Sequence, residues 1–213
     1  MLPLFHDFEG RSVVVVGGGP VALRKARTFA TEADVTVFAP AFADGFETVD
    51  CECVRRELEP ADAPVVVDDT FLVVPATDDG DLNDAVATAA REAGALVNRV
   101  DRRGDVVTPS RAESDRVTVA ISTDGASPAI SKYLRQEIEP LLERVDPMVS
   151  LQAELREELQ DDDELSVPER REALWRVLED EEVWQRLEDG READARARAW
   201  DLVNDVGNTD DEE

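Results

Sequence analysis

The sequence predicts an α/β fold over its first half, a short mixed α+β segment after it, and a helical C-terminal region. Up to about residue 111, apolar strand patterns alternate with helical patterns, which is typical of a parallel sheet covered by helices on both faces. The pattern then changes to an alternating strand at residues 117–122 and a helical apolar stripe at residues 130–138. From Met148 onward, leucines at every fourth position indicate helices alone.

The individual elements follow from these patterns. We expect strands at residues 13–16, 35–38, 51–55, 71–74 and 96–100, and intervening helices at residues 21–30 and 82–93. Gly94 is the usual stop for the second of these helices. Ser166, which lies two residues before a proline, predicts the start of a later helix. The tryptophans are expected to fill a small helical core, with a stacking platform for a flat ligand as the alternative: Trp175, Trp184 and Trp200.

The charge of the chain limits the classes of partner that it can bind and indicates the kind of solvent in which it works. The 213 residues include 50 acidic and 23 basic side chains, which gives a net charge of −27 and predicts that nucleic acid is repelled. Only two of the basic residues are lysines, a composition that we interpret as adaptation to a cytosol of very high salt. A disordered acidic protein is excluded because 42% of the residues are hydrophobic and follow strand and helix periods.

The sequence also predicts where the protein works. No stretch approaches the roughly 20 apolar residues of a membrane-spanning helix, and the N-terminus lacks the basic start and apolar core of a secretory signal. We therefore expect a cytoplasmic protein that does not contact a membrane.

Cys51 and Cys53 form an isolated C-x-C pair, and the one histidine, His6, is far away in the sequence. A zinc site needs more ligands than this, so we assign no metal ligand. Side chains two apart on a strand point roughly parallel and seldom bridge, so the expected state is two packed or half-exposed thiols.

The stretch VVVVGGGPVALRKA places three glycines between a buried strand and a helix. Gly17, Gly19 and Ala22 fit the G-x-G-x-x-A pattern of dinucleotide-binding Rossmann folds: the first glycine allows the tight turn, the second lets the backbone approach a diphosphate, and the third residue lets the helix pack closely. The N–H groups of the first helical turn would face the anion. A tight turn without a ligand is the alternative. The residues expected to contact the cofactor here are Gly17, Gly18, Gly19, Pro20 and Val21.

The end of the second predicted strand lacks a residue that often selects the cofactor. Ala39 and Pro40 stand where many NAD-binding proteins carry an acidic residue for the ribose hydroxyls, and no arginine stands there for a 2′-phosphate. The sequence therefore does not separate NAD from NADP. Thr77, Asp78 and Asn98 follow or end other predicted strands, so we expect them beside the dinucleotide at the same carboxyl edge.

Four motifs occur in a known order and spacing: GGGPVALRKA, PATDDGDLN, VNRVD and ISTDGASPAISKYLR. With them, residues 2–144 resemble the siroheme synthase N-terminal family, that is, precorrin-2 dehydrogenase, which in several members also acts as sirohydrochlorin ferrochelatase. Both lysines of the chain, Lys25 and Lys132, lie inside these motifs, which indicates a constraint on them, with packing of the aliphatic stem as the alternative.

The resemblance implies NAD-dependent oxidation of precorrin-2 to sirohydrochlorin, followed in bifunctional members by insertion of ferrous iron. It also implies a homodimer. The expected fold is then a Rossmann-type parallel sheet, an α+β dimerisation segment and a C-terminal helical domain. The corresponding ranges are an NAD-binding domain at 1–112, the dimerisation segment at 113–147, the helical domain at 148–207 and an acidic tail at 208–213. We expect no downstream methyltransferase, so that another enzyme would supply precorrin-2.

Asp101 follows the predicted strand at residues 96–100 and so belongs to the ligand-binding edge of the sheet. It matches the family's catalytic aspartate. A carboxylate there could accept a proton during oxidation, or it could hydrogen-bond the pyrrole N–H groups of the macrocycle. Capping of a turn is the alternative for Asp101.

A second anion site is expected at the turn GASP, where Ser127 predicts a helix N-cap and Pro128 the first helical residue. Precorrin-2 bears eight carboxylates, as the resemblance implies, and this helix start could hold one of them, although ordinary capping explains Ser127 as well. The expected counter-charges are Arg102, Arg103, Arg111 and Lys132.

Two other functions remain open from the sequence. A non-catalytic NAD-sensing Rossmann module would need the glycines but would have no use for Asp101. An oxidoreductase acting on a small substrate would want a histidine or lysine acid, and His6, ahead of the first strand, is poorly placed for that role.

Overall fold

The computed structural model of the chain describes residues 2–161 and 165–207, and it divides into two compact units, Met1–Thr108 and Pro109–Glu213. The predicted boundary at 112 lies four residues later, and the predicted tail at 208–213 is outside the described residues. The elements of the first unit are β1 (Ser12–Val16), α1 (Pro20–Phe29), β2 (Asp34–Ala39), η1 (Phe46–Thr48), β3 (Glu52–Arg55), η2 (Pro60–Asp62), α2 (Ala63–Val66), β4 (Leu72–Pro75), α3 (Gly80–Glu92) and β5 (Leu96–Val97).

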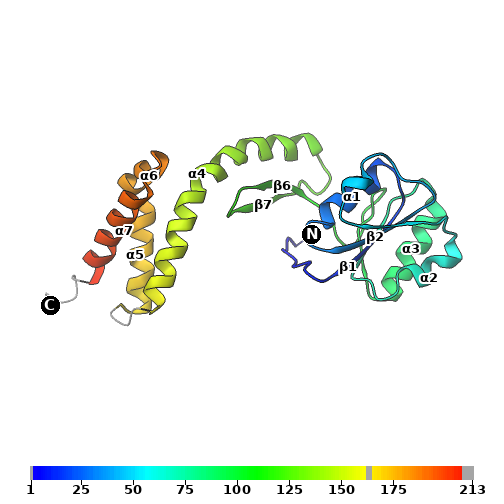
Figure 1. Cartoon of the computed structure of the whole chain (residues 1–213), viewed down its shortest axis with the longest axis horizontal. Helices are drawn as coiled ribbons and strands as arrows, with labels where there is room; N and C mark the ends of the chain where they lie inside the picture. The colour runs from blue at the N-terminus through cyan, green and yellow to red at the C-terminus, as the bar shows by residue number, and fades with distance from the viewer. Residues whose placement is uncertain (1, 162–164, 208–213) are drawn as a thin grey trace. The chain divides into compact units, whose positions relative to one another are not determined.

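The first unit is a five-stranded, all-parallel sheet in the order β3-β2-β1-β4-β5, with α1 on one face and α2 and α3 on the other (Figure 1). This is the predicted Rossmann arrangement. The strand order reverses between β1 and β4, and at that point an open α/β sheet offers a crevice for a ligand beyond the carboxyl ends of its strands.

The four valines of β1 are buried because helices cover both faces of the sheet. Val13 and Val15 pack in the cluster beneath α1, and Val14 and Val16 pack in the cluster beneath α2 and α3. A strand buried on both sides carries a continuous apolar run rather than an alternation, which is why the sequence pattern identified β1.

The last strand of the sheet is shorter than predicted. β5 ends at Val97 rather than at Val100, because the carbonyl of Val97 accepts hydrogen bonds from the backbone N–H groups of Asp105 (2.9 Å) and Val106 (3.3 Å). Residues 99–104 therefore form a loop that leaves the strand end and returns to it. This loop carries Asp101.

The second unit begins with a β-hairpin. Its elements are β6 (Ser110–Glu113), β7 (Thr118–Ile121), α4 (Pro128–Asp161), α5 (Val167–Glu179), α6 (Glu181–Glu188) and α7 (Glu192–Gly207). The side chain of Asp146, on α4, accepts hydrogen bonds from the Ser114 hydroxyl (2.8 Å) and from the backbone N–H groups of Asp115 and Arg116, so α4 holds the hairpin turn.

α4 differs from the prediction of separate helices at 130–138 and after 148. It is one helix of 34 residues, and it continues through Pro140 and Pro147. Figure 1 shows that it bends. Each proline removes a helical hydrogen bond and kinks a helix without always ending it, so the prolines explain both the bend and the missed continuity.

The second half of α4 packs with α5, α6 and α7 around a leucine-rich core that includes Leu151, Leu155 and Leu159. Trp184 and Trp200 pack against this core as predicted. The prediction was wrong for Trp175, which is 60% exposed and whose indole N–H donates to Glu179. Ser166 caps α5 in a reciprocal capping box with Glu169, as its position indicated.

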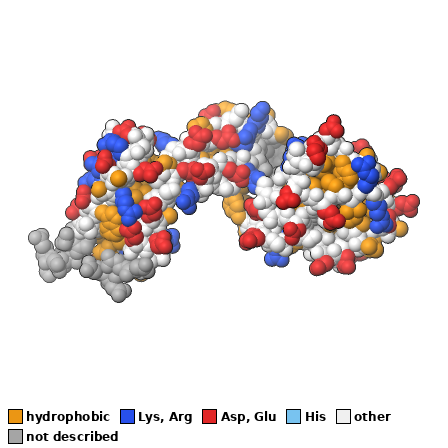
Figure 2. Space-filling model, viewed as in Figure 1, with side chains coloured by type: hydrophobic (Ala, Val, Ile, Leu, Met, Phe, Trp, Pro, Cys, Tyr) orange, Lys and Arg blue, Asp and Glu red, His pale blue; other side chains and the backbone are white. Residues whose placement is uncertain are grey.

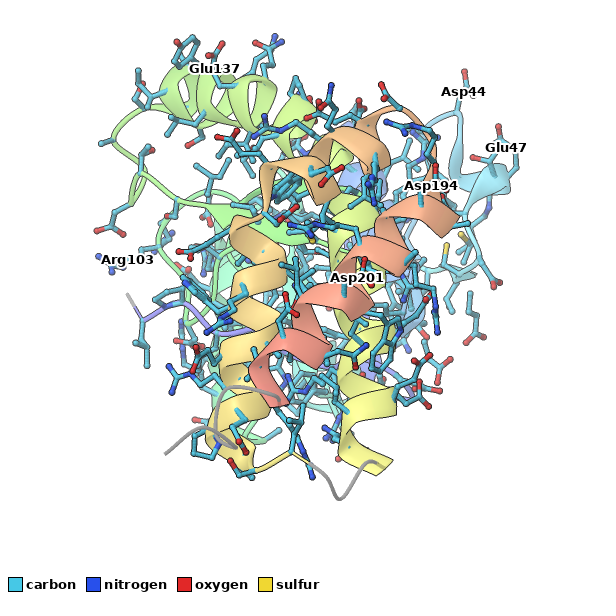
Figure 3. The ribbon with its side chains drawn as sticks, turned by 90° about the vertical axis from the view of Figure 1, so that its left-hand side faces the viewer. Asp44, Glu47, Arg103, Glu137, Asp194 and Asp201 are labelled. Carbon is cyan, nitrogen blue, oxygen red and sulfur yellow. The ribbon has the colours of Figure 1, made fainter. Side chains whose placement is uncertain are left out.

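The surface carries the excess of acidic side chains. Figure 2 shows carboxylates spread over the visible face of both units, and Figure 3 shows Asp194 and Asp201 projecting outward from α7. Within residues 2–161 and 165–207, no helix is long and apolar enough to cross a membrane. Cys51 and Cys53 are free thiols with their sulfurs 3.8 Å apart, as expected of an unbridged pair; Cys51 is half-buried as predicted, whereas Cys53 is exposed.

Candidate active site

The glycine loop after β1 is shaped by close backbone contacts. Gly17 has φ +131°, and a Cβ at this position would overlap the carbonyl of Ala76, which follows β4. A Cβ on Gly18 would overlap the carbonyl of Ala41, and the Gly18 carbonyl accepts the backbone N–H of Ala43 at 2.8 Å. Gly17 and Gly18 therefore let three loops meet at the reversal point of the sheet.

Gly19 differs from its neighbours because nothing lies within 4 Å of where its Cβ would stand. It caps α1 without a side chain, Pro20 is the first helical residue, and the first turn holds no acidic residue. The first turn of α1 thus begins beside open space at Gly19, at the positive end of the helix dipole. A dinucleotide diphosphate fits this cradle, and Ala22, which is fully buried, gives the close helix packing that the motif predicts.

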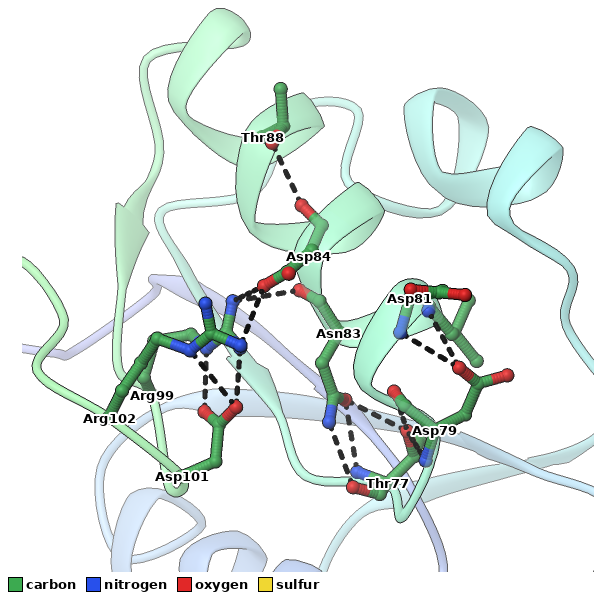
Figure 4. A network of polar contacts seen from close by, with 10 residues as sticks. Thr77, Asp79, Asp81, Asn83, Asp84, Thr88, Arg99, Asp101 and Arg102 are labelled. Carbon is green, nitrogen blue, oxygen red and sulfur yellow. Dashed lines mark hydrogen bonds and ion pairs between the residues drawn. The ribbon is translucent and has the colours of Figure 1, made fainter.

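The loop after β4 is organised by a buried asparagine. The side chain of Asn83 accepts from the backbone N–H (3.1 Å) and the hydroxyl (2.9 Å) of Thr77 and donates to the Thr77 carbonyl (2.8 Å). Asp79 caps α3 by accepting from the N–H groups of Asp81 and Leu82 (Figure 4). The Thr77 side chain thus supports the turn, whereas Asp78 is exposed beside it at the carboxyl edge.

At the end of β2, Ala39 is buried and Pro40 is exposed, so neither offers a polar side chain to a ribose. Strand pairing places Arg55, the last residue of β3, directly beside Ala39. The Arg55 guanidinium lies 5.9 Å from the centre of the Phe42 ring. An arginine therefore does stand beside the position that lacks the acidic residue, which the linear sequence could not reveal because 16 residues separate the two.

Asn98, at the end of β5, is 1% exposed. Its side-chain N–H₂ donates to the Val106 carbonyl at 3.0 Å, and its Oδ1 has no hydrogen-bond partner within the part of the chain that the structure describes. A buried oxygen without a donor is costly, so this atom is suited to accept a hydrogen bond from a ligand at the same edge.

Asp101 does not stand free. Arg99 donates from Nε to one carboxylate oxygen (2.7 Å) and from Nη2 to the other (2.5 Å), and Arg102 adds a longer contact of 3.3 Å (Figure 4). The hydrogen bonds from Arg99 hold the pKa of Asp101 well below its usual range, and the same contacts raise the pKa of Arg99. The side chain of Asp101 is 34% exposed, so the paired carboxylate still reaches the surface.

The remaining predicted site residues belong to the second unit and are described there by themselves. Ser127 caps α4 through its hydroxyl, which accepts the Ile130 N–H at 3.3 Å. Arg111, on β6, pairs with Glu113 at 3.2 Å, and Lys132 is exposed near the start of α4. Within the first unit, the structure thus gathers the glycines, Thr77, Asp78 and Asn98 at one edge of the sheet.

Comparison with known proteins gives this arrangement a family. A family model described as "Putative NAD(P)-binding" matches residues 4–110, and one described as "Sirohaem biosynthesis protein central" matches residues 115–140. The precorrin-2 dehydrogenase of Methanosarcina barkeri is 37% identical over 211 residues, which cover 95% of this chain and 93% of that protein. This chain belongs to the precorrin-2 dehydrogenase family.

Other relatives of this precorrin-2 dehydrogenase homologue are longer. The siroheme synthases of Sodalis glossinidius and Pseudomonas aeruginosa are 36% and 33% identical over 144 and 202 residues, and the chain spans only 31% and 42% of their length. The solved structure of SirC, precorrin-2 dehydrogenase, has a TM-score of 0.71 over 94% of this chain and 100% of that chain, at 24% identity, which shows a shared fold. The first unit is therefore the NAD-binding domain of a precorrin-2 dehydrogenase homologue.

Arg99 and Asp84 are parts of this site that the sequence did not single out. Arg99 lies inside the motif VNRVD, but its contact with Asp84 on α3 depends on the fold of the loop at residues 99–104. The only available signal was an arginine two residues before the candidate catalytic aspartate.

Proposed function

We propose that this chain oxidises precorrin-2 to sirohydrochlorin with NAD as the hydride acceptor, as part of siroheme formation. The observation that carries the proposal is a glycine cradle at the sheet reversal point, with Asn98 and the Asp101 loop at the same carboxyl edge, in a chain similar to a precorrin-2 dehydrogenase over nearly its full length. NAD accepts the hydride, and the side chains and backbone of the protein bind and orient NAD and the substrate.

Of the two roles open to Asp101, the contacts favour the second. A carboxylate already paired with Arg99 and Arg102 is a weak base, so it is poorly suited to take a proton from the substrate. It remains a strong hydrogen-bond acceptor on its exposed side. We therefore assign Asp101 to binding and orienting the pyrrole N–H groups of the macrocycle while charge changes in the ring.

The substrate's carboxylates need cations in a protein of strongly negative charge. We propose that Arg102, Arg111 and Lys132 provide them, with the backbone N–H groups at the N-terminus of α4, near Ser127, as further donors to a carboxylate. The acidic, lysine-poor composition supports the proposal that the protein works in a cytoplasm of high salt.

The segment at 113–147 is proposed to dimerise the protein, between a Rossmann domain at 1–112 and a helical domain at 148–207. Its support is an apolar stripe on the first half of α4, at helical spacing, whose members are all exposed: Ile130, Tyr133, Leu134 and Leu141. A second copy of the chain would cover this stripe.

The substitution Asp101→Asn tests the proposal against a sensor that only binds NAD. We expect Asp101→Asn to bind NAD with unchanged affinity in calorimetry, because Asp101 lies outside the glycine loop. Oxidation of precorrin-2, followed anaerobically by absorbance, should be lost, and ferrous iron added at the end tests the second activity. A variant as active as the wild type would favour the NAD-sensing module.

A further inference from the structure

Arg99 has an unusual environment for an arginine in this protein. Its side chain is only 4% exposed, and each guanidinium nitrogen has an acceptor. Nε and Nη2 donate to the two oxygens of Asp101, and Nη1 donates to Asp84 at 2.7 Å and to the backbone carbonyl of Asn83 at 3.3 Å (Figure 4). Four of the five N–H donors of the guanidinium are therefore used, and they include the two that face a carboxylate side by side.

Other arginine pairs in the first unit are more exposed. Arg91 pairs with Asp105 at 3.2 Å, and its side chain is 46% exposed. Exposed pairs of this kind contribute little to stability and hold little geometry. Removing a guanidinium from water for a buried ion pair costs free energy that offsets the attraction to its carboxylates. Such a pair therefore fixes the position of its partners more than it stabilises the fold.

Arg99 also joins two elements of the site, the helix α3 and the loop after β5. Asp84 and Asn83 lie on α3, whose first turn is held to the β4 loop through Thr77 and Asp79, whereas Asp101 lies on the loop after β5. Arg102 contacts both Asp84 and Asp101 at 3.3 Å, which completes a cluster of two arginines and two carboxylates. Through Arg99, the helix that starts at the dinucleotide edge fixes the carboxylate beside it.

We propose that Arg99 is a positioning residue for the oxidation of precorrin-2: it aims the Asp101 carboxylate, and Asp84 anchors Arg99 to α3. The inference rests on the proposed function, because it gives Arg99 a role only through Asp101. A lysine could keep the charge but could not grip both oxygens of the carboxylate.

The experiment compares Arg99→Leu and Arg99→Lys with the matched control Arg91→Leu, which breaks an exposed arginine pair that does not include Asp101. For each, NAD affinity, kcat and KM for precorrin-2 are measured anaerobically from pH 4.5 to 8. We expect Arg99→Leu to lose about 100-fold in kcat, as misplacement of a catalytic group does, with NAD affinity unchanged. Arg99→Lys should fall between it and the wild type, and Arg91→Leu should match the wild type.

Two further readouts separate positioning from general damage to the fold. Without Arg99, the carboxylate of Asp101 loses its largest stabilising partner, so its pKa rises and the ratio of Arg99→Leu activity to wild-type activity should fall toward acid pH. Methylguanidinium at constant ionic strength should restore part of the lost kcat in a saturable way, and tetramethylammonium should not.

The outcomes are distinguishable. Two results overturn the role of Arg99 alone. In the first, the wild type and Arg99→Leu are equally active. In the second, Arg99→Leu is inactive and is not rescued by methylguanidinium, and Arg99→Lys is inactive as well. A wild type that forms no NADH overturns the proposed function and this inference with it.

Discussion

Gly18 and Gly19 are neighbours, but substitution by alanine is expected to have different effects at the two positions. In Gly18→Ala the new methyl would overlap the Ala41 carbonyl and lie 2.8 Å from the Ala39 Cβ. We expect this variant to lose about 2 kcal/mol of stability, as overpacked sites do. In Gly19→Ala the methyl meets no atom of the chain, so stability should stay within about 0.5 kcal/mol of the wild type.

Gly19→Ala, which should be the more stable of the two variants, is expected to impair binding of NAD. The Gly19→Ala methyl would occupy the space through which a diphosphate approaches the start of α1, so NAD affinity should fall by at least about tenfold, or 1.4 kcal/mol. Urea unfolding by circular dichroism and NAD titration measure the two effects. Unchanged NAD affinity in a stable Gly19→Ala would show that the cofactor does not use this cradle.

Lys25 gives the first unit a dependence on alkaline pH. Its ammonium donates to the Thr108 hydroxyl at 2.9 Å, and burial lowers its pKa from 10.5 to about 8. Between these values the unfolded chain binds more protons than the folded one, so this group makes stability rise as pH increases from 8 to 10.5. Allowing for solvent around a half-buried group, the rise is about 2 kcal/mol.

The variant Lys25→Met isolates this contribution, because titration of Cys51 and of other groups is the same in both proteins. We expect the stability difference, wild type minus variant, to increase across that pH range. Circular dichroism must follow it, since all three tryptophans lie in the second unit. A difference that stays flat with pH would mean that the ammonium is well hydrated in the folded chain.

Residues whose role is local were predictable, and residues whose role depends on distant partners were not. Gly17, Gly19 and Ala22 act through the strand, turn and helix that they themselves form, and the caps at Ser127 and Ser166 act within one turn of a helix. Arg55 and Arg99 depend on strand register and on a returning loop.

The apolar stripe on α4, Ile130, Tyr133, Leu134 and Leu141, predicts the behaviour of that helix in solution. Tyr133→Glu would place a charge in the proposed interface between two copies and should shift the protein toward monomer in sedimentation equilibrium in strong salt. Val167→Glu, at an apolar residue of α5 that is more exposed than Tyr133, is the matched control and should leave assembly unchanged. A wild type that is already monomeric would contradict the proposed dimer.

Elements with a strong period were predicted well, and elements defined by contacts were not. β1 and α3 follow from their apolar patterns and stop signals, and Gly94, with φ +82°, follows the end of α3. β6 has the sequence SRAE, without an alternating pattern of apolar residues, and forms a strand because β7 pairs with it. α4 keeps its helix through two prolines because its buried side chains pack against the hairpin and the helical core, which no local rule includes.

The two units of the chain have separate hydrophobic packing. The first unit packs a cluster on each face of its sheet and has the carboxyl edge proposed for the dinucleotide, and the second has its own helical core. Repulsion within a chain of net charge −27 is screened over about 3 Å in 1 M salt, so the activity of the whole molecule has to be measured in strong salt.

The measurement that tests the central claim most directly is the stoichiometry of one anaerobic reaction of the full chain with precorrin-2 and NAD in strong salt. The account predicts one NADH for each sirohydrochlorin formed, and slower formation of both products in Gly19→Ala at an NAD concentration near the dissociation constant of the wild type. Sirohydrochlorin formed without NADH, or equal rates from Gly19→Ala at that concentration, would contradict a reaction carried out on the dinucleotide at the start of α1.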